Sequence, residues 1–311
     1  MEEKIKVLID TDLGDDIDDA LALAWALETP ALDVVGVTTP FGNTNERARI
    51  GKKLLSMAGR ADIPVYAGVC DTIVKPVKPW SCCQRTPDID APEFAPVNDA
   101  EGNNGEAAID FIVDCAKKYG KELTIVAIGP LGNIARAFQK DAAAMNGTKG
   151  IVIMGGCFYG HFAEWNILCD AEAAKIVFEQ AENLTCVGVD VTGKTKLTKA
   201  QTDRILAYET DVPWKKYLIE LVGMWVAQSR DGLPCLHDPL ALSYLTNPEF
   251  LFMDQAIVEV ETEGHFSRGM TFNVDEMLHY EPLHHNGKKT TIARDIRAKA
   301  FVEYFINKVF G

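Results

Sequence analysis

The sequence predicts an α/β fold, with a Rossmann-like open, mainly parallel sheet flanked by helices. Short runs rich in β-branched residues alternate along the chain with longer segments of helical periodicity. The short runs are apolar throughout, a pattern typical of strands that a parallel sheet buries on both faces. Polar clusters follow several of these runs, and such sheets bind ligands beyond the carboxyl ends of their strands. We therefore expect a ligand site at that edge.

The predicted elements alternate in order along the first part of the chain. Six strands are predicted, at residues 4–10, 32–39, 63–68, 123–129, 150–156 and 184–190. Helical periodicity separates them at residues 17–28, 44–59, 104–119, 131–145 and 170–182. Alternation of this kind predicts strand–helix–strand units, in which neighbouring strands run parallel.

The C-terminal part has a different pattern. Helices are predicted at residues 212–230, 236–246 and 294–309, and paired strands within 254–273. Neither a linker nor an internal repeat divides the sequence, so we expect residues 1–311 to form a single domain. Residues 70–103 are rich in proline and have no clear period, and a loop this long usually covers a site or is mobile.

The composition excludes several classes of function. A formal net charge of −14 argues against a nucleic-acid partner and an anionic membrane surface, since either needs a basic face. No apolar run is long enough to span a bilayer, and the acidic N-terminus, MEEKIKVLID, does not have the pattern of a signal peptide. The eight cysteines are scattered without a CxxC pair, so we expect reduced thiols in a cytoplasmic protein.

Acidic residues are concentrated directly after the first predicted strand. Six aspartates lie within residues 10–19, before a predicted helix that is largely apolar. One or two can serve the helix N-terminus, which favours acidic side chains, and Asp16 with Asp19 resembles a capping box. Neighbouring carboxylates repel by about 4 kcal/mol per pair at ~4 Å and an effective dielectric of ~20. A divalent cation would remove that cost, and hard oxygen ligands favour Ca²⁺ or Mg²⁺ over zinc.

Two other metal-dependent motifs match this segment less well. An EF-hand loop that began at Asp10 would need glycine sixth and glutamate twelfth, but Gly14 is fifth and Leu21 is twelfth. A phosphatase of the haloacid dehalogenase type also begins with a strand that ends in Asp-x-Asp. It normally has threonine two residues after the second aspartate, where this chain has Gly14. A Mg²⁺-dependent phosphatase is kept as the weaker alternative.

The segment DTDLGDDIDDALAL (10–23) resembles the N-terminal signature of the inosine–uridine-preferring nucleoside hydrolases. Four later blocks are similar to that family, in the family's order: VTTPFGNTN (37–45), IVAIGPLGNIA (125–135), IVIMGGCFYGHFAEWNILCDAEAA (151–174) and HDPLAL (237–242). The resemblance implies the nucleoside hydrolase fold. It also implies hydrolysis of the N-glycosidic bond of ribonucleosides, which gives ribose and free nucleobase.

The resemblance further implies a Ca²⁺ site and roles for residues around it. The ligands would be Asp12, Asp19, Asp238 and the backbone carbonyl of Ile128. Asp12 would also be the general base that takes a proton from a metal-bound water, and Asp10 would orient the loop. Four further side chains would bind ribose hydroxyls or order the water: Asp18, Asn43, Glu164 and Asn166. Positive charge that develops on the sugar in an oxocarbenium-like transition state would be stabilised by this wall of carboxylates.

The residues around the leaving base are a separate hypothesis. His237 is the candidate acid, since histidine titrates in the useful range; alternatively it is a structural histidine that places Asp238. Trp225 and Arg230 could stack on or contact the base, although a tryptophan of the hydrophobic core is an equal alternative. His161, in the loop after the fifth strand, could reach the pocket.

Three functions therefore fit the sequence. A calcium-dependent ribonucleoside hydrolase is favoured. A nucleoside-binding protein with a metal site but little catalysis is the second, and the Mg²⁺-dependent phosphatase is the third. The resemblance suggests a homodimer or homotetramer, and it does not distinguish purine from pyrimidine bases.

Overall fold

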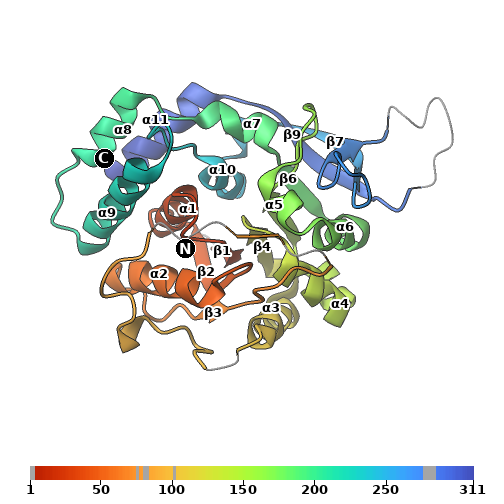
Figure 1. The fold of residues 1–311 in the computed structure, drawn as a ribbon, viewed down its shortest axis with the longest axis horizontal. Helices are drawn as coiled ribbons and strands as arrows, with labels where there is room; N and C mark the ends of the chain where they lie inside the picture. The colour runs from red at the N-terminus through yellow and green to blue at the C-terminus, as the bar shows by residue number, and fades with distance from the viewer. Residues whose placement is uncertain (1–3, 75–76, 80–83, 101–102, 276–284) are drawn as a thin grey trace.

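The computed structural model describes residues 4–74, 77–79, 84–100, 103–275 and 285–311. Its strands are β1 Ile5–Asp10, β2 Leu32–Thr39, β3 Val65–Ala67, β4 Leu123–Ala127, β5 Gly150–Met154, β6 Leu184–Val187, β7 Leu251–Val260, β8 Thr271–Asn273 and β9 Lys289–Ile296. They form one nine-stranded sheet in the order β3-β2-β1-β4-β5-β6-β9-β7-β8 (Figure 1). All pairs from β3 to β9 are parallel, whereas β7 runs antiparallel to both of its neighbours. The predicted mainly parallel α/β sheet is confirmed.

The helices cover both faces of this sheet (Figure 1). The predicted ones are α1 Asp18–Leu27, α2 Thr44–Met57, α3 Glu106–Tyr119, α4 Gly132–Asn146, α6 Ala171–Gln180, α9 Pro213–Gln228, α10 His237–Ser243 and α11 Ala298–Phe310. Three short helices were not predicted, namely α5 Trp165–Cys169, α7 Val189–Thr192 and α8 Lys199–Leu206. Single 3-10 turns lie at Pro92–Phe94, Gly120–Glu122, Gly193–Thr195 and Pro248–Phe250.

Two predicted elements are wrong at one end, because the chain forms a different element there. The strand expected at 184–190 ends at Val187, and the chain then turns into α7. The helix expected at 294–309 begins only at Ala298, because residues 289–296 form β9. This strand pairs with β6 on one side and with β7 on the other, and its buried Ile292 and Ala293 belong to the two opposite core clusters. Pairing on both sides outweighed the helical period of the overlapping segment.

The core consists of two clusters, one on each face of the sheet. Val7 and Ile9 of β1 pack in the cluster that contains residues of α1, α2 and α9 to α11, whereas Leu8 packs in the cluster of α3, α4 and α6. Successive side chains of a strand point to opposite faces. An apolar run without alternation is therefore what a strand covered on both faces requires, as predicted.

The site lies where the order of the strands in the sheet reverses, between β1 and β4. The chain builds outward from β1 through β2 and β3 on one side, and through β4 to β6 on the other. Beyond the adjacent carboxyl ends of β1 and β4, the Ile128 amide donates to the Asp10 carbonyl at 2.8 Å. Open α/β sheets bind ligands at such a reversal.

Two further predictions concern the chain as a whole. The single domain spanning residues 1–311 stays a prediction. Within the described ranges, no helix combines the length and apolarity that crossing a membrane demands.

Candidate active site

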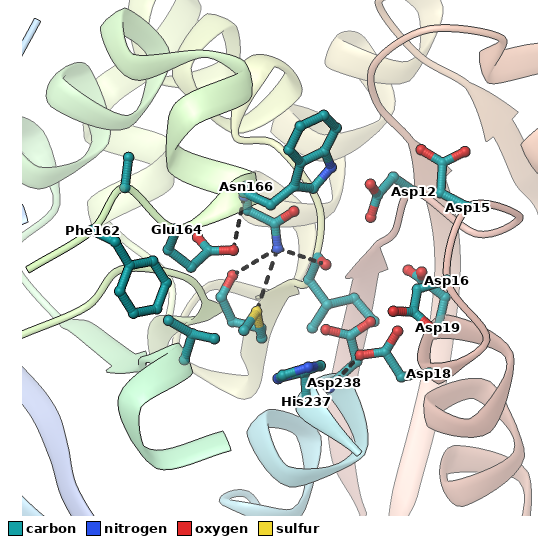
Figure 2. A pocket seen from close by; sticks show the side chains of 15 residues that line it. Asp12, Asp15, Asp16, Asp18, Asp19, Phe162, Glu164, Asn166, His237 and Asp238 are labelled. Carbon is teal, nitrogen blue, oxygen red and sulfur yellow. Dashed lines mark hydrogen bonds between the residues drawn. The ribbon is translucent and has the colours of Figure 1, made fainter. Parts of the chain in front are cut away.

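A cavity of about 300 Å³ lies beyond the carboxyl ends of β1, β4 and β5. It is lined by Asp12, Asp15, Asp16, Asp18, Asp19, Ile128, Met154, Phe162, Ala163, Glu164, Trp165, Asn166, Val189, His237 and Asp238. Figure 2 shows the aspartates from the N-terminal loop on one side and Glu164 with Asn166 on the other. Seven of these fifteen residues are carboxylic acids, so carboxyl groups make up nearly half of the lining.

The N-terminal aspartates are carried by residues 11–17, which we call the aspartate loop, and by the first turn of α1. The loop turns at Gly14, whose φ of 117° is unfavourable for other residues. Gly129, after β4, allows the close approach of the two strand ends, because a Cβ there would lie 2.8 Å from Asp12 Oδ1. The backbone conformation at these two glycines thus places the acidic side chains at the cavity.

Asp10 lies beneath the cavity instead of lining it. Its Oδ1 accepts hydrogen bonds from Thr38 Oγ1 at 2.5 Å and from Asn133 Nδ2 at 2.8 Å. These bonds join β1 to β2 and α4. Burial raises the pKa of Asp10 to about 7, against the opposing effect of the two hydrogen bonds. Its position fits the predicted role of orienting the loop.

Three buried carboxylates meet in the cavity, from Asp18, Asp19 and Asp238. Each offers an oxygen within 4.8 Å of the others, and in the described part of the chain this is the group that could hold a metal ion. Asp238 is the second residue of α10, and its amide donates to Asp18 Oδ2 at 3.3 Å across a separation of 220 residues. The packing of α1 against α10 therefore brings together the predicted ligands Asp19 and Asp238. Asp18, predicted as a ribose ligand, completes the group.

The other two predicted metal ligands, Asp12 and Ile128, line the same cavity outside this compact group. Asp12 is close enough for its charge to raise the pKa of Asp18, Asp19 and Asp238. The Ile128 carbonyl accepts a hydrogen bond from Asn166 Nδ2 at 3.2 Å. A carbonyl has two lone pairs, so this bond leaves one for another partner.

Burial and mutual repulsion raise the pKa of the cavity acids. Burial is the larger cause for Asp12, whose pKa rises to about 7 despite the charge of Arg47. For Asp18, Asp19 and Asp238, burial first and neighbouring carboxylates second raise the pKa well above its usual range. The residues thus fit a hard divalent cation, which would offset both effects.

Glu164 and Asn166 form the opposite wall. Glu164 caps α5: its Oε1 accepts from the Asn166 amide at 2.8 Å, and its Oε2 accepts from the amides of Gly156 and Ile167 at 3.1 and 3.2 Å. Asn166 Nδ2 donates to the carbonyls of Ile128 and Met154. Both residues line the cavity, and both also hold the wall together; their contact with ribose stays a prediction.

His237 lines the cavity beside Asp238. Its Nδ1 lies 2.6 Å from Thr192 Oγ1, so the ring is held by α7. Burial, with a smaller contribution from Lys196, lowers the pKa of His237 to about 4. The ring is therefore neutral at pH 7 and can offer a cavity ligand an N–H only from the nitrogen that carries its single proton.

Four predicted residues lie outside the residues that line the cavity. Asn43 caps α2, where its Oδ1 accepts from the Glu46 amide at 3.3 Å. Trp225 is half-buried against the hydrophobic core, whereas Arg230 and His161 are exposed. For Trp225 the structure matches the core alternative.

Sequence reasoning missed several residues at the cavity. Phe162 and Trp165 are aromatic side chains in its lining, and Phe162 is 51% exposed. They flank Glu164 in the segment FAEWN, which was the available signal. Arg47, on α2, is 2% exposed and bonds to the aspartate loop. A single arginine within a helical period carried no signal of this kind.

Known proteins resemble the chain over nearly its whole length. A family model described as inosine-uridine preferring nucleoside hydrolase matches residues 7–303. A probable uridine nucleosidase 2 of Arabidopsis thaliana is 30% identical, over 99% of this chain and 98% of its own. The pyrimidine-specific ribonucleoside hydrolase RihA of Citrobacter koseri is 31% identical, over 98% of each chain.

Solved structures agree with the fold. A plant nucleoside hydrolase, PpNRh1, has a TM-score of 0.84 at 25% identity, over 98% of this chain and 99% of its own. A purine-preferring ribonucleoside hydrolase from Gardnerella vaginalis has a TM-score of 0.79 at 27% identity, over 98% of both chains. The similarity extends across the sheet and the helices on both of its faces.

Proposed function

The chain belongs to the inosine-uridine preferring nucleoside hydrolase family, and from that premise we propose a calcium-dependent reaction at the cavity. The predicted family resemblance is confirmed. As a family member the protein is a glycosidase that hydrolyses ribonucleosides to ribose and free base. The proposal concerns the metal, the residues and the order of their action.

The proposed cation site uses Asp19 and Asp238, with Asp12 and the Ile128 carbonyl from the neighbouring wall. The buried acid group supports it, since its carboxylates form no ion pair with any lysine or arginine that the structure describes. A bound Ca²⁺ would hold the ribose 2′- and 3′-hydroxyls and make the attacking water more acidic. Asp18 lies beside both proposed ligands and accepts a hydrogen bond from one ribose hydroxyl.

Asp12 accepts the proton of the attacking water. Asn166 uses its Nδ2 on two backbone carbonyls, which leaves its Oδ1 as the acceptor available to a sugar hydroxyl. Glu164 and the aspartates surround the sugar with negative charge as positive charge develops on the ring. The reaction needs no covalent nucleophile.

His237 is proposed to assist the departing base as a neutral hydrogen-bond donor. In this proposal the Thr192 hydroxyl donates to Nδ1, which lies 2.6 Å away, and the ring proton on Nε2 is then available to the base. The aromatic side chains Phe162 and Trp165 provide apolar contact area for a planar base. Trp225 and Arg230 would reach the base only after a movement of α9 or of the loop that follows it.

The observation that carries the proposal is the meeting of Asp18, Asp19 and Asp238 from distant parts of the chain in one cavity. The test incubates the protein with Ca²⁺ or with a chelator and a panel of ribonucleosides, including uridine and inosine, and measures released base by chromatography. Base release with Ca²⁺ and its loss in chelator are expected, with 2′-deoxynucleosides much poorer substrates. Nucleoside binding without release would favour the binding-protein alternative, and phosphate release from sugar phosphates would favour the phosphatase.

Three features of the proposal concern the whole protein. A homodimer or homotetramer, a cytoplasmic location and a single domain stay predictions. Light scattering of the purified protein measures the first directly.

A further inference from the structure

We infer that Arg47 is a positioning residue, which holds the aspartate loop, and with it Asp12, in the geometry that the reaction requires. The inference rests on the proposed function, because Asp12 acts there as both ligand and base. Arg47 does not line the cavity, so it acts through the loop and not on the substrate.

The Arg47 guanidinium joins four acceptors, of which the Leu13 carbonyl is the most distant, at 3.4 Å from Nη1. Its Nε donates to the Phe41 carbonyl at 2.8 Å, and its Nη1 donates to the Asp12 carbonyl. Its Nη2 forms an ion pair with Asp15 Oδ2 at 2.8 Å. Donors from one rigid plane thus reach Asp12, Leu13 and Asp15 of the aspartate loop.

The same side chain holds the turn before α2. Phe41 has a φ of 62°, in the left-handed region that is unfavourable for a residue with a side chain. Its carbonyl is the one that Arg47 Nε bonds. A turn that is unfavourable by itself is therefore fastened to the aspartate loop through one guanidinium.

Arginine is suited to this position in a way that lysine is not. Its planar fork presents five donors in a fixed arrangement, whereas a lysine ammonium is a single point charge on a flexible stem. Burying such a charge costs several kcal/mol unless it is paired and hydrogen-bonded. At 2% exposure, Arg47 meets this requirement by pairing with the Asp15 carboxylate and by donating to backbone carbonyls. Asp15 therefore serves to anchor the loop.

The test compares Arg47→Met and Arg47→Lys with wild type, and Arg49→Met is the matched control. Arg49 lies on the same helix, but its guanidinium bonds Asp99 at 2.6 Å and Asn45 at 2.9 Å, away from the loop. A misplacement near ~1 Å costs about 100-fold in rate, so kcat of Arg47→Met should fall between about 10-fold and 100-fold. KM should change less than about threefold, since no contact to substrate is removed. Arg47→Lys should lie in between, and Arg49→Met should match wild type.

A second measurement does not depend on turnover. Calorimetric titration with Ca²⁺ alone should show about tenfold weaker binding for Arg47→Met than for wild type, because Asp12 is no longer held beside the other acids. Circular dichroism checks that each variant is folded. If Arg47→Met fails to fold, Arg47→Lys and Asp15→Asn carry the test. A folded Arg47→Lys with wild-type kcat and Ca²⁺ affinity would overturn the inference.

An error in the proposed function and an error in the positioning role of Arg47 give different results. If wild type releases no base from any nucleoside, the proposed function is wrong, and the Ca²⁺ titration still tests the loop. If wild type is active and Arg47→Met has its kcat and Ca²⁺ affinity, the positioning role is wrong and the function stands.

Discussion

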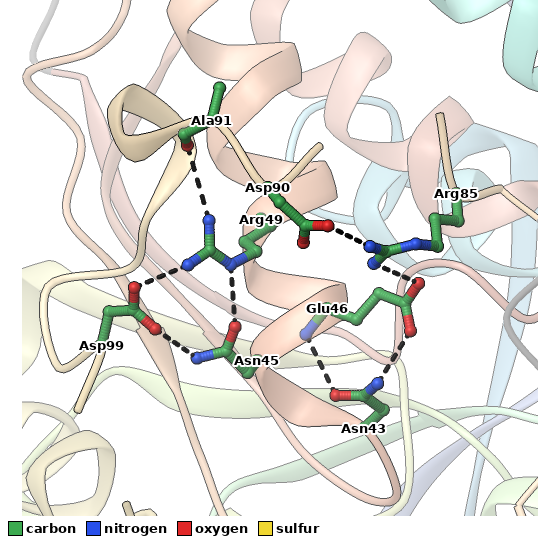
Figure 3. A network of polar contacts seen from close by, with 8 residues as sticks. All are labelled: Asn43, Asn45, Glu46, Arg49, Arg85, Asp90, Ala91 and Asp99. Carbon is green, nitrogen blue, oxygen red and sulfur yellow. Dashed lines mark hydrogen bonds and ion pairs between the residues drawn. The ribbon is translucent and has the colours of Figure 1, made fainter. Parts of the chain in front are cut away.

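Acidic side chains gather in two places on this molecule, in the cavity and along the outer side of α2. On α2 and the neighbouring residues 84–99, three acids take part in a polar network (Figure 3). Arg49 pairs with Asp99 at 2.6 Å, and Arg85 pairs with Glu46 at 3.0 Å and also with Asp90. Each acid of this surface network therefore has an arginine beside it.

The cavity acids are arranged in the opposite way. Six of the seven are buried and Asp16 is partly buried, and Asp15 is the one that pairs with an arginine among the residues that the structure describes. Gln84 links the two regions, because its Nε2 donates to the Asp16 carbonyl at 2.5 Å. Exposed pairs contribute little to stability, whereas buried carboxylates without a counter-charge destabilise the fold. Such a cost is tolerated where it serves function, here by preparing a place for a cation.

The largest expected effect comes from removing a cavity charge. Asp12→Asn keeps the shape and removes the proposed base, so kcat should fall about 1000-fold or more. Without cation the unfolding midpoint should stay the same or rise, because one repulsive charge is gone. Asp99→Asn is the control from the surface network and should leave kcat unchanged. A wild-type kcat for Asp12→Asn would contradict the assigned role of the cavity.

The next largest effect is on the free energy of unfolding, which should depend on both pH and bound cation. Burial raises the pKa of Asp12 and Glu164 to about 7 from the usual 3.8 and 4.5. A raised pKa in the folded state gives stability that is complete below the unfolded value and is lost as pH rises through the folded value. In chelator, the free energy of unfolding should therefore fall between pH 4 and pH 7, by urea melts.

Calcium should restore that loss, increasingly so toward pH 7. A ligand at ~100 times its Kd stabilises a protein by about 2.7 kcal/mol. Asp19→Asn, which lacks a proposed ligand, should respond much less to Ca²⁺. Equal free energies of unfolding at pH 4.5 and pH 7 in chelator would show that ionisation of the cavity acids does not destabilise the fold.

The smallest effect is expected where charges are already paired. Lys53 of α2 donates to Thr86 at 3.0 Å and Asp88 at 2.6 Å, and its Nζ lies 4.3 Å from the Tyr217 ring centre. Lys53→Met should cost about 1–2 kcal/mol of unfolding free energy and leave kcat unchanged. Lys199→Met, from an exposed pair with Asp203, should change neither. A large loss of kcat in Lys53→Met would mean that residues 84–99 control the cavity.

Much of the architecture could be predicted because a strand that is buried on both faces is an apolar run without alternation. The run at 32–39 lacks alternation, and β2 has those bounds. β9 was not predicted: its last three residues overlap the predicted helix at 294–309, and the strand is defined by its pairing with β6 and β7. Trp225 was equally suited to a pocket and to a core, and packing decided for the core.

By itself, the sequence determined that acids would crowd the end of the first strand, since that density of carboxylates is costly without a purpose. It also determined the order along the chain of the polar segments that follow the strands. Tertiary structure alone decided that Asp238 would lie beside Asp18 and Asp19, and that Arg47 would turn inward to Asp15 while Arg49 turned outward. Those choices depend on how helices pack across the sheet, and packing joins residues whose separation in sequence carries no local signal.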